Sequence, residues 1–266
     1  MTAALPPSSR GTLFPDRLPP RFRRLTPDPE MSELVRWWWI SEWDLAPGER
    51  SEQRLLSYPA SNLAVETSLV GFAGPTTRAT TRVLEGRGWV VGAQLSPAAV
   101  PAFADRPAAT RDRYLELDEP GLHATVAAFA DGLLDDAVAP VGDWLRERVG
   151  PLSEEALEAG RMARLASEDA SIASVPQHAA RLAVSERTLH RLAERYVGLT
   201  PYALIQRRRL QEAAELLRRS PEVPIAEVAA SHGFADQAHF TRSFKAALGQ
   251  TPSSYRAEAR GAEPAC

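Results

Sequence analysis

The pattern of apolar and polar positions divides the chain into a strand-like part and a helical part. From about residue 34 to 95, short segments rich in β-branched and aromatic residues alternate with Gly, Pro and Asn. These segments are LVRWWWISEWDL, NLAVETSLV, TTRATTRVL and GWVVGAQL. Several short strands at regular spacing predict a small barrel or sandwich. Residues 119–170 instead carry apolar residues at helical spacing, so helices are expected to follow the strands.

The chain is predicted to be entirely helical from residue 172 onward, and its capping residues repeat. Ser185 can cap a helix that Gly198 ends, because Gly accepts the left-handed conformation of a helix terminus. Asp236 and Gly249 stand at the matching positions 51 residues later. Between the two copies, residues 201–219 predict one long helix. The region therefore predicts two helix-turn-helix units joined by a linker helix.

The second helix of each unit is predicted to bury one stripe and expose the other. The expected buried positions are Leu189, Leu192, Ala193 and Tyr196 in the first copy and Phe240, Phe244, Ala247 and Leu248 in the second. The linker helix of 19 residues would be roughly 28 Å long at 1.5 Å per residue. A spacer of that length could hold the second helices of the two units about one turn of a DNA duplex, roughly 34 Å, apart.

The exposed faces and the local charge favour DNA as the partner. Residues 171–260 hold 13 basic and 8 acidic side chains, a net of +5, whereas the whole chain has a net charge of −3. Charged helix faces are usually only solvated, but Arg191 and Arg242 occupy the same place in two matched units. Arg and Gln can each form two hydrogen bonds with a base edge in the major groove. The expected phosphate contacts are Arg195, Arg207, Arg208 and Lys245, with Arg209 as a further candidate.

These segments resemble the C-terminal domain of the AraC/XylS family of bacterial transcription regulators over about residues 172–257. The resemblance is densest in RRRLQEAAELL, IAEVAASHGFADQAHFTRSFKAALGQTPSSYR and SERTLHRLAERYVGLTP. It is looser in SVPQHAARLAVS, where Pro176 and His178 depart from the family pattern. The resemblance implies an operator in double-stranded DNA and contact with RNA polymerase. The base-reading residues that it implies are Arg187, His190, Arg191, Gln237, Ala238, Thr241 and Arg242, with His239 as a further contributor.

Residues 34–97 resemble more loosely the cupin-like barrel that many members of that family carry. The resemblance implies a domain that binds a small effector, forms a homodimer, or does both. Trp37, Trp39 and Trp89 are the candidate pocket residues, although aromatic residues that alternate on a strand more often belong to the core. The expected fold is α+β with two domains: a small N-terminal β-barrel with trailing helices, and an all-α C-terminal domain. The expected boundaries are a flexible lead-in over residues 1–30, a sensor or dimerisation domain over 31–165, and a DNA-binding domain over 166–260.

Other classes of protein lack support in the sequence. A metal-dependent cupin enzyme needs clustered His with a carboxylate, but the first His is His123, beyond the strands. The one cysteine, Cys266, offers neither a disulfide nor a thiolate metal site. No enzyme activity, metal or cofactor is therefore expected. The sequence also shows no secretion signal and no apolar run of about 20 residues, so we expect a cytoplasmic protein with no membrane partner.

The expected function is a one-component transcription regulator that responds to a small-molecule effector through its N-terminal domain. Two alternatives stay open at this point. In one, the N-terminal domain only dimerises or binds a protein partner. In the other, a cupin-type enzyme is fused to a DNA-binding tail.

Two substitutions on the second exposed face test the predicted recognition surface. Arg242→Ala should weaken operator binding by about 1–3 kcal/mol and relax specificity at one base pair, because a base contact is lost. Lys245→Ala should weaken binding to all sequences alike and lower the salt slope by about one unit, because a phosphate contact is lost. Gel-shift titration against the promoter DNA of the protein's own gene measures both changes. Unchanged binding in both variants would show that the face is assigned wrongly.

Overall fold

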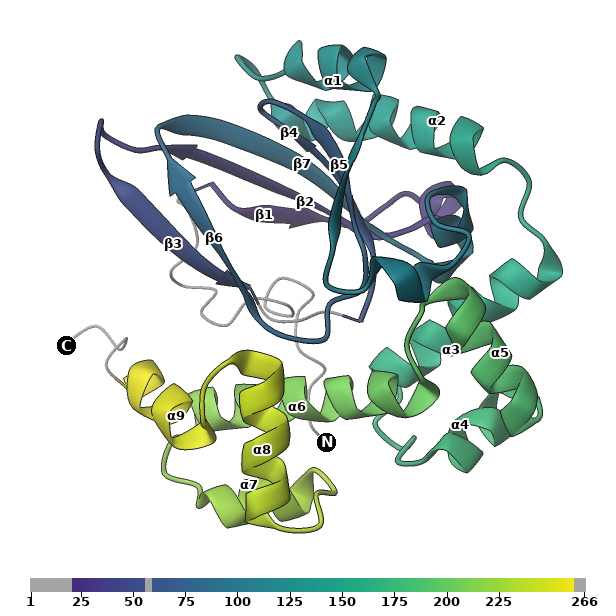
Figure 1. The fold of residues 1–266 in the computed structure, drawn as a ribbon, viewed down its shortest axis with the longest axis vertical. Coiled ribbons are helices and arrows are strands. Elements are labelled where there is room, and N and C mark those ends of the chain that lie inside the picture. Colours follow the sequence, from purple (N-terminus) through teal and green to yellow (C-terminus); the bar gives the residue numbers. More distant parts are fainter. Residues whose placement is uncertain (1–20, 56–58, 261–266) are drawn as a thin grey trace.

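The computed structural model describes residues 21–55 and 59–260 (Figure 1). The N-terminal part contains a six-stranded antiparallel sheet in the order β1-β2-β7-β4-β5-β8. The bounds of its strands are β1 (Arg23–Leu25), β2 (Val35–Asp44), β4 (Asn62–Glu66), β5 (Val70–Ala73), β7 (Arg87–Leu95) and β8 (Tyr114–Leu117). Most of the expected lead-in, residues 1–20, lies outside the described residues. Its last part includes β1, which pairs with β2 and so belongs to the sheet.

One face of this sheet packs against helices, as the alternation of side chains requires. Trp38 and Ile40 point to this face and are buried in a core with Phe72. The helices α1 (Pro120–Ala127) and α2 (Val138–Val149) cover the face (Figure 1). Their expected helical spacing is confirmed, and the core of the N-terminal domain lies between sheet and helices.

The opposite face of the sheet is built from aromatic side chains lying over glycines. Trp39 lies over Gly92 and Trp43 lies over Gly88, both on β7, so closely that a Cβ at either glycine would collide with the indole ring. Because β-strand side chains alternate, Trp37 shares this face with Trp39 and Trp43. The tryptophan-rich strand therefore has only Trp38 on the helix-covered face.

A bent ribbon extends from the sheet toward the helical domain (Figure 1). It consists of β3 (Arg50–Leu55) and β6 (Thr80–Glu85), which continue the β2–β7 ladder beyond a bend. Gly86 sits at the bend with a φ of +55°, a conformation that favours glycine. Among the described residues the ribbon and the main sheet remain two separate sheets. Strand pairing among these residues therefore does not show a closed barrel, and the closure of the predicted barrel stays a prediction.

The helical domain begins earlier than the sequence indicated. Its helices are α3 (Glu154–Glu168), α4 (Val175–Leu182), α5 (Glu186–Tyr196), α6 (Pro201–Arg219), α7 (Ile225–Ser231), α8 (Gln237–Leu248) and α9 (Pro252–Arg260). Ala159 and Met162 of α3 pack in one core with Leu189 and Leu192 of α5. The expected boundary between residues 165 and 166 therefore falls inside a helix that is packed into the first helix-turn-helix unit.

The two helix-turn-helix units repeat their caps as the sequence predicted. The Ser185 hydroxyl accepts the N–H of Thr188 at 3.1 Å, and the Asp236 carboxylate accepts the N–H of His239 at 2.6 Å. Gly198 and Gly249 end the two helices, each with a φ of +77°. In Figure 1, α6 runs between the two units, with α5 near one end and α8 near the other.

Each unit has its own hydrophobic core, and the expected buried stripes of α5 and α8 are confirmed. The second core is aromatic: the ring centroids of Phe240 lie 4.9 Å from Phe234 and 5.3 Å from Phe244. Phe240 and Phe244 are completely buried. Truncation of such a side chain to Ala costs about 3–5 kcal/mol, so these rings hold α8 in place. The polar side chains of the same helix are left on its outer surface.

The two helix-ending glycines provide a matched pair of substitutions. Gly249→Ala should cost roughly 1 kcal/mol from the left-handed conformation alone, because an added Cβ comes no closer than 3.9 Å to Ala79. Gly198→Ala should cost clearly more, because its Cβ would lie 2.4 Å from the backbone nitrogen of Ala108 in the N-terminal domain. Chemical denaturation of both variants measures the difference. Equal losses of stability would contradict the close packing of the first unit against the N-terminal domain.

Candidate DNA-binding surface

The structure places the predicted base-reading side chains on the outer faces of α5 and α8. Arg187, His190 and Arg191 are exposed on α5. On α8, Gln237, Ala238 and Arg242 are exposed, and Thr241 is half-buried. The reason is local: the buried stripe of each helix turns these positions outward. Their contacts with bases stay a prediction.

His239 differs from the other predicted contributors. It is half-buried, and its ring meets the edge of Phe234 with the centroids 5.6 Å apart. Its backbone N–H binds the Asp236 cap. His239 therefore stabilises the start of α8, and its half-buried ring is less accessible than the exposed side chains of the same helix.

On α5, which we call the first reading helix, two arginines already form ion pairs with a carboxylate of the protein. Glu155, at the start of α3, accepts hydrogen bonds from Arg191 and from Arg195, the latter at 2.7 Å. The sequence analysis did not identify Glu155, because α3 precedes the repeat and its approach to α5 is a tertiary contact. Arg191 is thus held by a neighbouring helix rather than being free on the surface.

On α8, the second reading helix, the corresponding basic side chains have no such ion pair among the described residues. Neither Arg242 nor Lys245 forms a side-chain hydrogen bond or ion pair with any part of the chain that the structure describes. The N–H of His239 lowers the pKa of the Asp236 carboxyl, and the charge of Arg242 adds to this effect. The cap therefore stays ionised at the N-terminus of the helix, where a negative charge is favourable. The two reading helices consequently differ in how readily their arginines can reach DNA.

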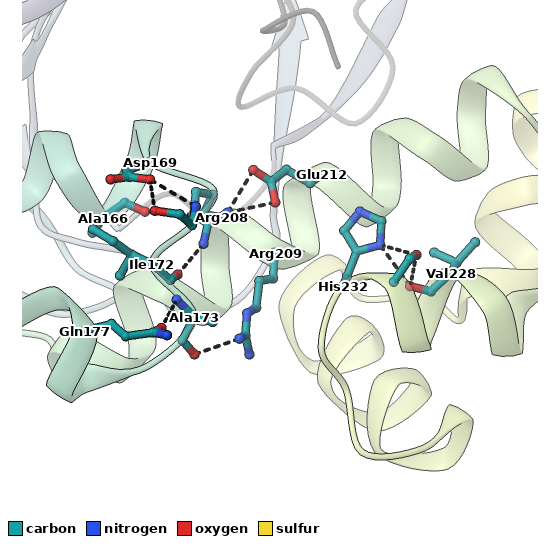
Figure 2. Close-up of polar contacts among 12 residues, drawn as sticks. Ala166, Asp169, Ile172, Ala173, Gln177, Arg208, Arg209, Glu212, Val228 and His232 are labelled. Carbon is teal, nitrogen blue, oxygen red and sulfur yellow. Dashed lines mark hydrogen bonds and ion pairs between the residues drawn. The ribbon is translucent and has the colours of Figure 1, made fainter. Parts of the chain in front are cut away.

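Arg208 is not a phosphate contact in this structure, contrary to the prediction. Its side chain is only 5% exposed and lies inside the helical domain (Figure 2). It donates to the carbonyl oxygens of Ala166 at 3.0 Å and Ile172 at 2.6 Å, and it pairs with Glu212 at 3.0 Å. A charge buried in this way is stable only with such partners. Arg208 therefore fastens α6 to the end of α3 and to the loop that follows it.

Its two neighbours on α6 are also engaged within the protein. Arg209 donates to the carbonyl of Ala173 at 2.7 Å (Figure 2). It also donates to the carbonyl of Gly233 at 3.4 Å, so it bridges the two helix-turn-helix units. Arg207 points to the N-terminal domain and donates to the carbonyl of Thr77 at 2.9 Å. Burial lowers the pKa of Arg207 to about 10, and the nearby Asp112 carboxylate limits the shift. Arg207 and Arg209 therefore make structural contacts in this arrangement, and their predicted role as phosphate contacts is corrected.

The predicted tryptophan pocket is also not assembled. Trp89 lies on the helix-covered face of the sheet, 6.1 Å from His123 between ring centroids. Trp37 and Trp39 lie on the opposite face, where Trp39 donates to Asn62 at 3.3 Å. The sequence pattern could not reveal this, because β2 and β7 pair in a register that only the folded sheet determines.

His178 replaces the residue that the family pattern leads one to expect, and it is completely buried. Its Nε2 lies 2.9 Å from the carbonyl oxygen of Met162. Burial lowers the pKa of His178, and the Met162 carbonyl opposes part of that shift. The imidazole is therefore neutral near pH 7 and serves as a link between α4 and α3.

The geometry defines the class of this region as a double helix-turn-helix domain. Residues 178–258 match a family described as "Helix-turn-helix domain", and residues 23–116 match a "Domain of unknown function (DUF6597)". The transcriptional activator RhaS of Escherichia fergusonii is 42% identical over 76 residues, which are 29% of this chain and 27% of RhaS. The transcriptional regulator MtrA of Neisseria gonorrhoeae is 39% identical over 75 residues, which are 28% of this chain and 25% of MtrA.

Over the helix-turn-helix region the chain is similar to known bacterial transcription regulators, in agreement with the resemblance to the AraC/XylS family. The chain spans only about a quarter of the length of the curated relatives that it matches. Among solved structures, ToxT from Vibrio cholerae is similar with 12% identity and a TM-score of 0.46, covering 82% of this chain and 97% of ToxT. The C-terminal domain of AraT from Geobacillus stearothermophilus is 30% identical with a TM-score of 0.35, covering 40% of this chain and 88% of that domain.

Removal of the carboxylate that holds the first reading helix should raise DNA affinity. In Glu155→Gln, Arg191 and Arg195 lose their ionic partner and become available to an anionic ligand. We expect several-fold tighter binding at low salt and a steeper salt dependence in a fluorescence-anisotropy titration.

Glu154→Gln is the matched control. It makes the same change of charge on the preceding residue, whose side chain is exposed and forms no ion pair within the described part of the chain. If both variants gained the same affinity, net charge rather than release of the two arginines would be the cause.

Proposed function

We propose that this protein is a transcription regulator that binds double-stranded DNA with both helix-turn-helix units. The observation that carries the proposal is the repetition of exposed reading faces on α5 and α8 at the two ends of one rigid helix (Figure 1). The relatives RhaS and MtrA, which match this region, are named as transcription regulators. The faces offer Arg and Gln, which suit base edges in the major groove.

In the proposed complex, each reading helix enters one segment of the major groove on the same side of the duplex. The α6 helix of 19 residues spans roughly 28 Å, which suits two segments about one DNA turn apart. Lys245 on α8 would then lie near the backbone, together with Arg195 if Glu155 releases it. Arg207 and Arg208 are not part of this contact surface.

The N-terminal domain is proposed to regulate this binding in response to a small molecule. Its contacts with the DNA-binding domain support this role. Arg36 of β2 pairs with Glu168 of α3 at 2.9 Å, and Glu33 pairs with Arg164 at 3.1 Å. Because α3 also contributes to the core of the first helix-turn-helix unit, a shift of the N-terminal domain would be transmitted to α5.

The proposal includes two further partners. A homodimer and a contact with RNA polymerase are expected of a regulator of this family. No helix in the described part of the chain is both long and apolar enough to cross a membrane.

A footprint tests whether both units bind. Full-length protein on the promoter DNA of its own gene should protect two segments about ten base pairs apart, because each reading helix occupies one major-groove segment. Arg187→Ala should weaken protection of one segment, and Arg242→Ala should weaken protection of the other. Hydroxyl-radical cleavage resolves the two segments.

Arg111→Ala provides the control, because Arg111 is an exposed arginine in the N-terminal domain, and its guanidinium bonds only the nearby Ala108 carbonyl within the described residues. Its footprint should equal that of the unmodified protein. Loss of both segments together in each reading-helix variant would contradict independent reading by the two units. Absence of any footprint on DNA would refute the proposed function.

A further inference from the structure

A small cavity lies where the N-terminal domain meets the DNA-binding domain. Its volume is about 50 Å³, and it is bordered by the end of the sheet, by α3, by the last residue of α5 and by the middle of α6. The polar groups and the aromatic residue in its wall are Arg36, Ser61, Gln94, Ser167, Tyr196, Arg208 and Gln211, and Arg36 donates to the Ser167 hydroxyl at 3.2 Å. A molecule in this cavity would touch both domains at once.

Two polar side chains in the wall are deeply buried and lack a hydrogen-bond partner within the described residues. Ser61 is 2% exposed and Gln94 is 3% exposed, and the Ser61 hydroxyl and the Gln94 carbonyl oxygen are both unpaired. The amide nitrogen of Gln211, from α6 on the other side, is also unpaired. Buried polar groups are almost always hydrogen-bonded, so three such groups around one cavity indicate a polar occupant.

The chemistry of the wall restricts that occupant. Ser61 and Gln211 can donate hydrogen bonds, whereas the Gln94 oxygen accepts one. Arg36 adds a positive charge, although its ion pair with the exposed Glu168 balances part of it. Arg208 is fully engaged with carbonyl groups and with Glu212, so it shapes the wall rather than binding a ligand. An anion that also carries a hydroxyl group would satisfy these donors, the Gln94 acceptor and the positive charge.

The size of the cavity restricts the occupant further. A cavity needs about 10–15 Å³ to hold one water molecule, so this cavity of about 50 Å³ has room for roughly four waters. A carboxylic acid with two to four carbon atoms and one hydroxyl group is of this size. A nucleotide, a sugar ring or a long acyl chain is too large.

We propose that this cavity is a binding site for a small hydroxy acid, and that its ligand holds the two domains together as they are docked here. The carboxylate would face Arg36, Gln211 and the Ser61 hydroxyl, and the ligand hydroxyl would donate to Gln94. In the docked arrangement the residues just after α5 pack against the N-terminal domain, where a Cβ at Gly198 would lie 2.4 Å from the backbone nitrogen of Ala108, so α5 is restrained by that domain. A ligand that favours this arrangement therefore lowers DNA affinity by shifting the population toward it. The effect on DNA rests on the proposed function, but binding of the ligand does not.

Calorimetric titration of the full-length protein with glycolate, L-lactate, D-lactate and glycerate tests the site. At least one of these acids should bind saturably with a stoichiometry of one. Propionate, which has the size of lactate but no hydroxyl group, should bind at least tenfold more weakly, because it leaves Gln94 unpaired. Ser61→Ala and Gln94→Leu should each weaken binding of the acid at least tenfold.

Two further variants separate the cavity from general effects on the sheet. Ser51→Ala and Gln53→Leu make the same chemical changes on β3, where the two side chains hydrogen-bond to each other at 2.8 Å, away from the cavity. Both should bind the acid normally. Ala163→Leu adds atoms to the cavity wall without removing a polar group, and it should abolish binding by filling the space.

The same acid is then added to an anisotropy titration of the protein with its promoter DNA. A several-fold loss of DNA affinity that disappears in Gln94→Leu would support the proposal. Absence of saturable binding by all four acids, or binding that Ser61→Ala and Gln94→Leu leave unchanged, would overturn the site. Tighter DNA binding in the presence of the acid would overturn the locking role. DNA binding without acid binding would leave the proposed function intact, whereas acid binding without DNA binding would refute that function and not the site.

Discussion

The buried guanidinium of Arg208 is the contact on which the arrangement of the DNA-binding domain depends. It lies in the middle of α6 and binds the carbonyls of Ala166 and Ile172, so it sets the position of the linker helix against the first helix-turn-helix unit. The second unit packs on the later turns of the same helix through Leu210 and Leu217. Removal of one partner of a buried charge costs about 3–5 kcal/mol, which is much more than a surface ion pair contributes.

The ion pairs between the two domains are of a weaker kind. The Arg36–Glu168 pair has a carboxylate that is 58% exposed, and exposed pairs contribute about 0–1 kcal/mol. Each helix-turn-helix core, in contrast, contains fully buried side chains such as Phe240 and Leu189, worth about 2–5 kcal/mol each on truncation to Ala. The units are therefore rigid bodies, whereas the ion pairs at the junction between the domains can be broken at a lower cost.

The two units share one sequence pattern but have different surroundings. Gly198 meets the backbone of Ala108, and Arg191 is held by Glu155, so the first unit is packed between the N-terminal domain and α3. Within the described part of the chain, a Cβ added at Gly249 would come within 4 Å of the side chain of Ala79 alone, and Arg242 is exposed. The arginines of α5 are thus restrained by neighbouring parts of the chain, whereas Arg242 of α8 faces solvent.

The sequence by itself determined what local periodicity and capping control. The stripe from Phe240 to Leu248, the caps at Ser185 and Asp236, and the linker helix over residues 201–219 follow from spacing within one or two turns. Only the tertiary structure decided the roles of single arginines, because exposure depends on partners that are distant in the chain. Arg208 and Arg242 look alike in the sequence, yet one is buried by α3 and the other faces solvent. The sheet register likewise separated Trp89 from Trp39, since a shift of one residue exchanges the two faces of a strand.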